Sequence, residues 1–184
     1  IIEAQIETGQ PYMLYKDAIN EKSNQKNIGV IKSSNLCAEI VEYSEEKETA
    51  VCNLASIALP KYVNKGGDYD YKKLYQIAKI ATKNLDMVID VNFYPTKKTN
   101  KSNSLHRPIG LGVQGLADVY FKMNISYDCA KAREINKKIF ETIYFAALQA
   151  SMELAKEKGA YSTFKGSPLS EGKFQFDLWN IEPS

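Results

Sequence analysis

The feature that most constrains the fold of this chain is a long helical pattern over residues 128–158. Apolar residues recur there at spacings of three and four, which places them on one face of a helix. Lys156 and Lys158 precede Gly159, a combination typical of a helix C-terminus. The apolar face consists of Ile135, Ile139, Ile143, Ala146, Ala150 and Leu154. The pattern predicts one long helix that buries a single face.

A second amphipathic pattern begins at Tyr71 and predicts another helix. Asp68 and Asp70 lie near its start, where carboxylates interact favourably with the helix dipole. Its apolar face comprises Leu74, Ile77, Ala78, Ala81, Leu85 and Val88. The second half of the chain is therefore expected to be mostly helical.

Shorter elements are predicted around these two helices. Residues 116–123 carry apolar residues at helical spacing, and residues 1–9 resemble the closing turns of an amphipathic helix that ends at a glycine. Residues 10–20 mix proline with aromatic residues and are predicted to be irregular or extended. Polar stretches at residues 21–27 and 95–108 are predicted to be loops.

Two apolar runs in the first half carry the strand signals of the chain. Residues 28–44, "IGVIKSSNLCAEIVEYS", are rich in β-branched residues with period-2 stretches. Residues 49–63, "TAVCNLASIALPKYV", form a second run that Pro60 interrupts. The runs could pair like a hairpin, or their later parts could be helical, because short apolar runs are ambiguous. Together with the helices they indicate an α/β fold.

Composition excludes several classes of protein. The 184 residues include 24 basic and 22 acidic ones, for a formal charge of +2, which gives no basis for predicting nucleic-acid or membrane binding. No apolar run reaches the ~18 residues that span a bilayer, and no signal peptide opens the chain. Three cysteines, one histidine and no CxxC pair argue against a zinc site, so no metal is predicted. An odd thiol count suits a reducing compartment.

Residues 110–115 read "GLGVQG", a literal GxGxxG motif. A dinucleotide fold needs a strand before this motif and an acidic residue closing a second strand about 20 residues later. The preceding segment is polar and contains Pro108, and no such acidic strand end follows. We therefore expect close backbone packing at a strand-to-helix junction, and binding of a dinucleotide is the weaker alternative.

The stretch "SNLCAEI" places three different polar groups at alternate positions, namely Asn35, Cys37 and Glu39. In an extended segment these side chains share one side, while Leu36 and Ala38 point to the other and can anchor the backbone in a core. Along a straight strand the outer two lie ~13 Å apart, and a curved loop would bring them closer. A thiol, an amide and a carboxylate suit a substrate with adjacent hydroxyl groups.

This stretch and the run "AVCNLASIALPKYV" resemble the active-site region of the large, catalytic subunit of class I ribonucleotide reductase, closest to the eukaryotic type. The resemblance continues in order through most of the chain, in "ETGQPYMLYKDAIN", "KSNQKNIG", "HRPIGLGVQGLADVY", "IFETIYFAALQAS" and "GSPLSEGKFQFDLWN". The resemblance implies a ten-stranded α/β barrel with a finger loop in its centre. It also implies that residues 1–184 are a fragment of that catalytic barrel, without the regulatory N-terminal region and the C-terminal tail.

The resemblance assigns roles to the alternating residues. Cys37 matches the cysteine that becomes a thiyl radical and abstracts the hydrogen on the 3′ carbon of the ribose. Glu39 matches the carboxylate that takes the 3′-hydroxyl proton, and Asn35 matches the amide that binds the ribose hydroxyls. The backbone and side chains of residues 35–39, including Leu36 and Ala38, are then expected to contact the substrate, a ribonucleoside diphosphate.

The resemblance also implies partners. Cys52 matches one member of the thiol pair that reduces the substrate, and its family partner lies outside this chain, whereas Cys129 is expected to pack. The segment itself is expected to bind no cofactor. The full enzyme is expected to need a small subunit with a radical-generating metal, nucleoside triphosphate effectors and a thioredoxin or glutaredoxin reductant. It is also expected to be a cytoplasmic homodimer of large subunits.

Two rival interpretations stay open at this stage. The chain could be a non-enzymatic helical interaction module in which the thiols are incidental. Within the reductase family, a cobalamin-dependent member could share the Asn-Leu-Cys core, although the surrounding eukaryotic-type sequence argues against it. The isolated fragment is expected to be inactive, because it carries the centre of the active site without the rest of the barrel.

Overall fold

The computed structural model describes residues 1–182, which divide into two compact units. Unit 1 is assembled from three separate segments of the chain: Ile1–Val51, Tyr94–His106 and the residues from Ser162 onward. Unit 2 consists of Cys52–Phe93 and Arg107–Tyr161. The chain therefore crosses between the units several times.

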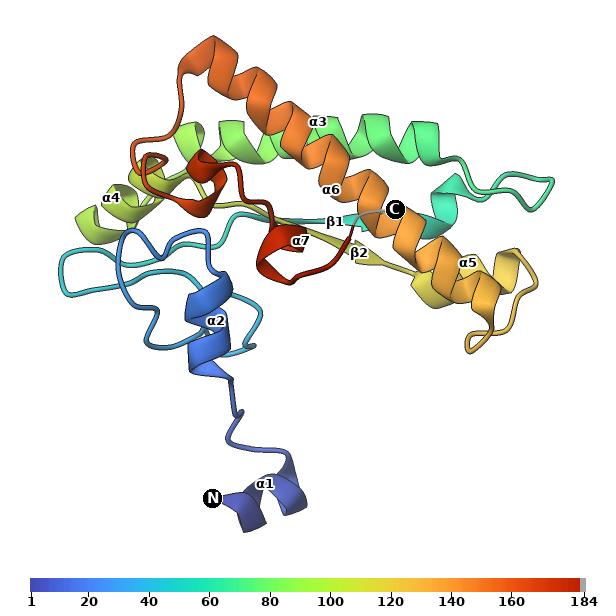
Figure 1. The fold of residues 1–184 in the computed structure, drawn as a ribbon, viewed down its shortest axis with the longest axis horizontal. Coiled ribbons are helices and arrows are strands. Elements are labelled where there is room, and N and C mark those ends of the chain that lie inside the picture. Colours follow the sequence, from blue (N-terminus) through green and yellow to red (C-terminus); the bar gives the residue numbers. More distant parts are fainter. Residues whose placement is uncertain (183–184) are drawn as a thin grey trace. The chain divides into compact units, whose positions relative to one another are not determined.

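Unit 2 contains the sheet and the long helices. Its elements are β1 (Leu54–Ala58), the 3-10 helix η1 (Leu59–Tyr62), α3 (Tyr71–Val91), β2 (Gly110–Gln114), α5 (Leu116–Lys122) and α6 (Ala130–Lys158). The strands β1 and β2 form a two-stranded parallel sheet in which Leu54 is paired with Gly110 and Ala58 with Gln114. In Figure 1, α6 crosses α3 at an inclined angle, and these two helices make the most extensive contact in the unit.

The apolar face predicted for α6 is confirmed almost in full. Ile135, Ile139, Ile143, Ala146 and Ala150 are buried, and Leu154 is partly buried. The face of α3 is turned slightly from the prediction, because Ile89 is buried in place of Val88 and Ile77 is 37% exposed. The buried residues of α3 are Leu74, Ala78, Thr82, Leu85 and Ile89. Burial of these two faces against each other explains why both helices form.

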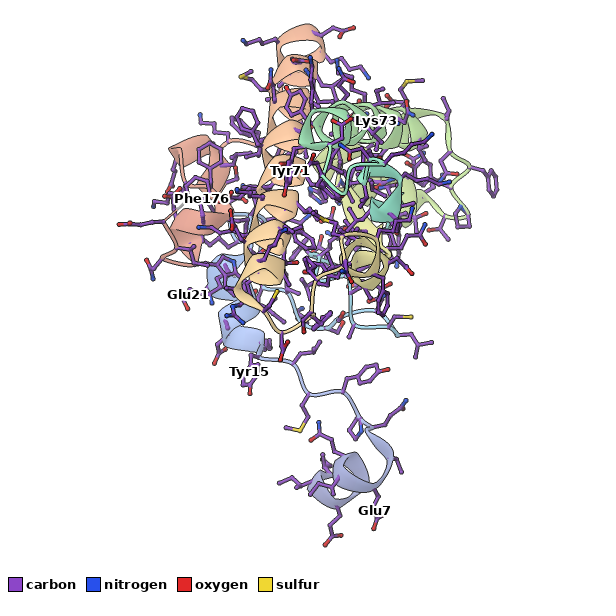
Figure 2. The ribbon with its side chains drawn as sticks, turned by 90° about the vertical axis from the view of Figure 1, so that its right-hand side faces the viewer. Glu7, Tyr15, Glu21, Tyr71, Lys73 and Phe176 are labelled. Carbon is purple, nitrogen blue, oxygen red and sulfur yellow. The ribbon has the colours of Figure 1, made fainter. Side chains whose placement is uncertain are left out.

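The ends of these helices are set by local side chains. The Asp70 carboxylate accepts a hydrogen bond of 2.9 Å from the Lys73 amide and thereby caps the start of α3. Figure 2 shows Tyr71 and Lys73 at this first turn. The Cys129 sulfur accepts a bond of 3.3 Å from the Ala132 amide at the start of α6. A capping carboxylate and a capping sulfur thus satisfy amides that no helical carbonyl can reach.

An ion-pair network joins the ends of α3 and α6 to the segment that leads into β2. Arg107 donates to Asp86 Oδ1 at 2.8 Å and to Asp90 Oδ1 at 2.7 Å. Lys158 Nζ lies 2.9 Å from Asp86 Oδ2. The hydrogen bond from Arg107 lowers the pKa of the Asp90 carboxyl. Each charged group of this partly exposed network has an opposite charge within bonding distance.

The predicted strand at residues 28–44 is wrong, since that segment contains no strand. Only the second apolar run forms one, as β1, and its partner is β2 in parallel rather than the first run in a hairpin. β-branched residues alone favour an extended backbone, but a strand also requires a partner for its amides. Residues 31–43 find those partners in side chains and turns instead.

The prediction for "GLGVQG" as a close-packed junction is confirmed. A Cβ atom on Gly110 would lie 2.5 Å from Leu54 Cδ2, so the strand pair has no room for a larger residue there. Gly115, with φ of 79°, joins β2 to α5, and its Cβ would lie 2.7 Å from ring carbons of Pro60. The glycines therefore serve the approach of β2 to β1 and η1.

Unit 1 contains short helices and long irregular segments. Its elements are α1 (Ile2–Thr8), α2 (Lys16–Lys22), α4 (Lys97–His106), the 3-10 helix η2 (Pro168–Glu171) and α7 (Gln175–Leu178). The predicted helix at the start of the chain is confirmed as α1, and Gly9 ends it with φ of 73°. Figure 2 shows Glu7 on α1 and Tyr15 just before α2.

Two of the predicted irregular segments are partly helical. Helix α2 begins within the stretch expected to be extended and ends at Lys22. Helix α4 occupies most of the predicted loop at residues 95–108, and its buried residues are Ser102, Asn103 and His106. The prediction was wrong because a helix that buries polar side chains has no apolar periodicity. A local signal exists, since the Thr96 hydroxyl accepts from the Thr99 amide at 3.2 Å.

Polar side chains, among them the buried Glu48 and His106, tie the three segments of unit 1 together. His106 Nε2 lies 3.1 Å from Glu48 Oε1, and His106 Nδ1 lies 2.9 Å from Thr163 Oγ1. Asn27 donates to the carbonyls of Thr163 and Lys165. Because each bond joins residues from different segments, unit 1 is held by polar contacts between parts of the chain that lie far apart in sequence.

Candidate active site

The candidate catalytic residues lie on a tight turn, not on a strand. Residues 36–38 form the turn, and the Ala38 amide donates to the Asn35 carbonyl at 3.1 Å. Ala38 has φ of 66°, a left-handed conformation that reverses the chain direction. The expectation of strict alternation between two faces is therefore wrong here, because the turn folds residues 35–39 back on themselves.

The fold of this turn brings two of the predicted groups into direct contact. Asn35 Nδ2 donates a hydrogen bond of 2.7 Å to Glu39 Oε1. Asn35 Oδ1 accepts from the Ile40 amide at 3.0 Å. The backbone N–H of Ile40 needs an acceptor, and in the Asn35 side chain only Oδ1 can accept. This second bond therefore leaves Nδ2 facing Glu39. The curved arrangement that the sequence left open is the one observed.

Cys37 lies between these two residues, and its side chain is exposed. Leu36 is 90% exposed, so the prediction that it anchors the segment in a core is wrong for this chain. Its position at the tip of a turn, rather than on the inner face of a strand, explains the difference. Ala38 is partly buried. The turn therefore presents a thiol, an amide and a carboxylate on an accessible loop.

Side chains from α2 and the turn that follows it hold the segments on both sides of this loop. Asn20 Oδ1 accepts from the Ile31 amide at 2.7 Å, and Asn20 Nδ2 donates to the Ile31 carbonyl at 2.9 Å. Gln25 Oε1 accepts from the Tyr43 amide at 2.7 Å. A Cβ atom on Gly29 would lie 2.4 Å from the Tyr43 ring, so the incoming and outgoing segments pack closely. These contacts fix the base from which the turn projects.

The other two cysteines lie in unit 2. Cys52 is exposed and precedes β1 by two residues. Its redox role stays a prediction. Cys129 is partly buried, packs against the core of the unit and caps α6, in agreement with the packing role expected for it.

Glu42 is a partly buried residue close in sequence to the turn. Its Oε2 atom is buried and has no hydrogen-bond partner among the described residues. Burial raises the pKa of Glu42 from 4.5 to about 7, because desolvation penalises the charged form. Near neutral pH this side chain is therefore close to its midpoint between acid and carboxylate.

We expect Glu42→Gln to stabilise the chain at high pH. The pKa of Glu42 in the folded state lies above its unfolded value of 4.5. The contribution of the protonated Glu42 to folding stability is therefore complete below about pH 4.5 and is lost as the pH rises toward 7. The glutamine cannot ionise and avoids this loss. Urea unfolding at pH 5 and pH 8 should show the variant gaining about 2 kcal/mol relative to the parent between the two values.

Glu46→Gln, on the exposed part of the same loop, controls for the change in net charge. A difference between the Glu42 variant and the parent that is the same at both pH values would contradict the assignment of a raised pKa.

Two negative findings apply to residues 1–182. No three histidine, cysteine, aspartate or glutamate side chains gather there in an arrangement that could hold a metal ion. No helix in the same region combines the length and the apolar character needed to cross a membrane.

Comparison with known proteins identifies the family. The chain matches the family model "Ribonucleotide reductase, barrel domain" over residues 1–184. It is 57% identical over 184 residues to the ribonucleoside-diphosphate reductase large subunit of Caenorhabditis elegans, and 54% identical to the large chain of Schizosaccharomyces pombe. The large subunit of Trypanosoma brucei brucei is 58% identical over 182 residues. The chain belongs to the ribonucleotide reductase family.

These relatives are much longer than the chain. The matches cover 100% of this chain but 23% of the Caenorhabditis elegans and Schizosaccharomyces pombe proteins, and 99% of this chain but 22% of the Trypanosoma protein. The family and its barrel domain agree with the α/β class predicted from the sequence. The structure itself contains a two-stranded parallel sheet among its described residues.

Sequence reasoning missed two residues near the turn. Ser34 Oγ donates to the Ile40 carbonyl at 2.5 Å, a contact across six positions that hydrophobic periodicity does not indicate. Glu42 was not singled out because its burial depends on packing between segments rather than on its neighbours in sequence. A serine directly before an asparagine is a weak signal for a side chain that bonds to a nearby backbone.

Proposed function

We propose that this chain is part of the catalytic barrel of a ribonucleotide reductase large subunit that reduces ribonucleoside diphosphates to 2′-deoxyribonucleoside diphosphates. The family match over the whole chain supports this proposal, as do relatives named ribonucleoside-diphosphate reductases. A non-enzymatic helical module is not favoured, because the match includes the polar turn as well as the helices.

One observation of the structure carries the proposal furthest. The Asn35 amide and the Glu39 carboxylate are hydrogen-bonded at 2.7 Å on a single turn, with Cys37 between them. A carboxylate that is already held by an amide is positioned to accept a proton from a bound hydroxyl. A thiol within the same turn can then reach the adjacent carbon of the same sugar.

In the proposed reaction, the Cys37 sulfur radical takes the hydrogen atom from the 3′ carbon of the ribose. Glu39 accepts the proton of the 3′ hydroxyl, and Asn35 holds the hydroxyl oxygens. The 2′ hydroxyl leaves as water with a proton from one thiol of a reducing pair, and the other thiol gives its hydrogen to the 2′ carbon. The pair becomes a disulfide and so supplies two electrons. Glu39 returns its proton to the 3′ oxygen, and return of the hydrogen atom from Cys37 to the 3′ carbon completes the product and regenerates the sulfur radical.

Cys52 is proposed as one thiol of the reducing pair, and its partner belongs to a part of the protein outside this chain. The remaining components follow from the family. They are a small subunit that generates the radical at a metal centre, nucleoside triphosphate effectors, and a thioredoxin or glutaredoxin that reduces the disulfide. The large subunit is proposed to be a homodimer and to work in the cytoplasm.

The finer architecture is also a proposal. The β1–β2 pair would belong to a ten-stranded barrel, with residues 34–40 as the finger loop in its centre. Parallel strands normally belong to larger sheets whose two faces are both covered, which favours further strands beside this pair. Enclosure in a barrel would also cover Leu36 and keep water from the sulfur radical.

A reductase assay tests the function. The full-length subunit is mixed with its small subunit, a dithiol reductant and cytidine diphosphate, and deoxycytidine diphosphate is measured by chromatography. We expect product that depends on the small subunit, and none from residues 1–184 alone. Absence of product from the full-length protein would contradict the proposed function, whereas product from residues 1–184 would contradict the need for the rest of the barrel.

A further inference from the structure

The base of the turn is closed by a residue outside the alternating set. Ser34 Oγ lies 2.5 Å from the Ile40 carbonyl oxygen and 3.3 Å from Asn35 Oδ1. A hydroxyl has one proton to donate, and the shorter distance indicates that Ser34 donates it to the Ile40 carbonyl. Ser34 thus joins the residue before Asn35 to the residue after Glu39.

The Ile40 backbone is held on both of its polar groups. Its amide donates to Asn35 Oδ1 at 3.0 Å, and its carbonyl accepts from Ser34. These two bonds form a clamp at the base of residues 34–40. Ser34 and Ile40 are partly buried, whereas Asn35, Cys37 and Glu39 are exposed. The shielded base therefore determines the geometry of an accessible tip.

The clamp also determines the orientation of the Asn35 amide. Because Oδ1 is committed to the Ile40 amide, Nδ2 must face Glu39, where the 2.7 Å bond is observed. If Ile40 moved away, the Asn35 side chain would lose the contact that selects this orientation. The Asn35–Glu39 pair would then be free to separate, and the thiol between them would lose its fixed position.

We propose that Ser34 is a positioning residue for the reaction: its hydroxyl closes the turn and holds Asn35, Cys37 and Glu39 in one reactive arrangement. This inference rests on the proposed function. Ser34 acts through the Ile40 backbone and the Asn35 amide and does not need to touch the substrate. Small displacements of groups that must meet a reacting atom are costly in rate.

The test compares Ser34→Ala with Ser34→Thr, which restores the hydroxyl, and with Ser33→Ala, an exposed neighbouring serine. All are made in the full-length subunit. The first measurement is amide hydrogen exchange in peptides covering residues 34–41. We expect Ser34→Ala to speed exchange at Ile40 about tenfold, the order expected for loss of one hydrogen bond. Ser34→Thr and Ser33→Ala should exchange like the parent.

The second measurement is reduction of cytidine diphosphate. We expect Ser34→Ala to lower kcat about tenfold with a smaller change in KM, because the turn is displaced while most of the substrate contacts remain. Ser34→Thr should recover most of the activity. A residue with a general structural role would not give this recovery together with exchange changes confined to the turn.

The possible results distinguish failure of the positioning role of Ser34 from failure of the proposed reductase function. An active parent with a fully active Ser34→Ala variant, or with unchanged exchange at Ile40, would overturn the role of Ser34 alone. Faster exchange in β1 as well as in the turn would show general unfolding and would also overturn it. A parent without reductase activity would overturn the proposed function, and the positioning role would fall with it.

Discussion

Replacing Cys37 with serine should abolish reductase activity in the full-length subunit, lowering kcat by at least about 10³-fold. Serine has nearly the same shape as cysteine, so the turn closed by Asn35 and Ile40 should form normally. The O–H bond is stronger than the S–H bond, and an alkoxyl radical would not form where a sulfur radical does. Product formation under single-turnover and steady-state conditions measures the loss.

Cys129→Ser is the matched control for this variant. The Cys129 sulfur caps α6 by accepting from the Ala132 amide, and serine is a preferred residue at that position. The control should therefore fold and turn over like the parent. Substantial activity in Cys37→Ser, with circular dichroism matching the parent, would exclude chemistry at this sulfur.

Replacing Ile139 with alanine should destabilise the chain by about 4 kcal/mol. Ile139 lies on α6, is fully buried and belongs to the core cluster of unit 2. Alanine would remove three carbons from a packed interior and leave a cavity that rigid helices can only partly fill. Urea unfolding followed by circular dichroism at fixed pH measures the change.

Ile80→Ala supplies the comparison on α3, because that isoleucine is 53% exposed. Its loss should cost less than about 1 kcal/mol. Equal effects of the two substitutions would mean that α3 and α6 do not pack through the faces described. The pair of variants therefore tests the helix–helix contact and not merely the loss of an apolar side chain.

Helices with apolar faces could be predicted from sequence, and helices with polar faces could not. The prediction of the buried face of α6 was correct, because isoleucines at helical spacing lie on one side of the helix and are buried together. Helix α4 was missed because its buried residues, Ser102, Asn103 and His106, are polar, and the partners of His106 lie in distant segments. The spacing of apolar residues indicates which face of a helix is buried, but it gives no information about hydrogen bonds between polar side chains.

The candidate site could also be predicted only in part from the sequence. The residue types at 35, 37 and 39 are the basis of the proposed chemistry, but their arrangement on a turn depends on Ala38 in a left-handed conformation and on hydrogen bonds to Ile40. An alternating sequence is compatible with a strand or with such a turn, and only the available backbone partners decide between them. The exposed position of Leu36 follows from that choice.

The assembly of unit 1 from distant segments has a consequence for synthesis on the ribosome. Asn27 bonds to the carbonyls of Thr163 and Lys165, and His106 bonds to Thr163. These partners are translated long after the thiol-bearing turn has left the exit tunnel. The bonds that close the turn are local and can form as soon as residues 34–40 have emerged, whereas the bonds of Asn27 and His106 to Thr163 must wait for more than a hundred further residues. The reactive loop can therefore take its shape before the unit that contains it is complete.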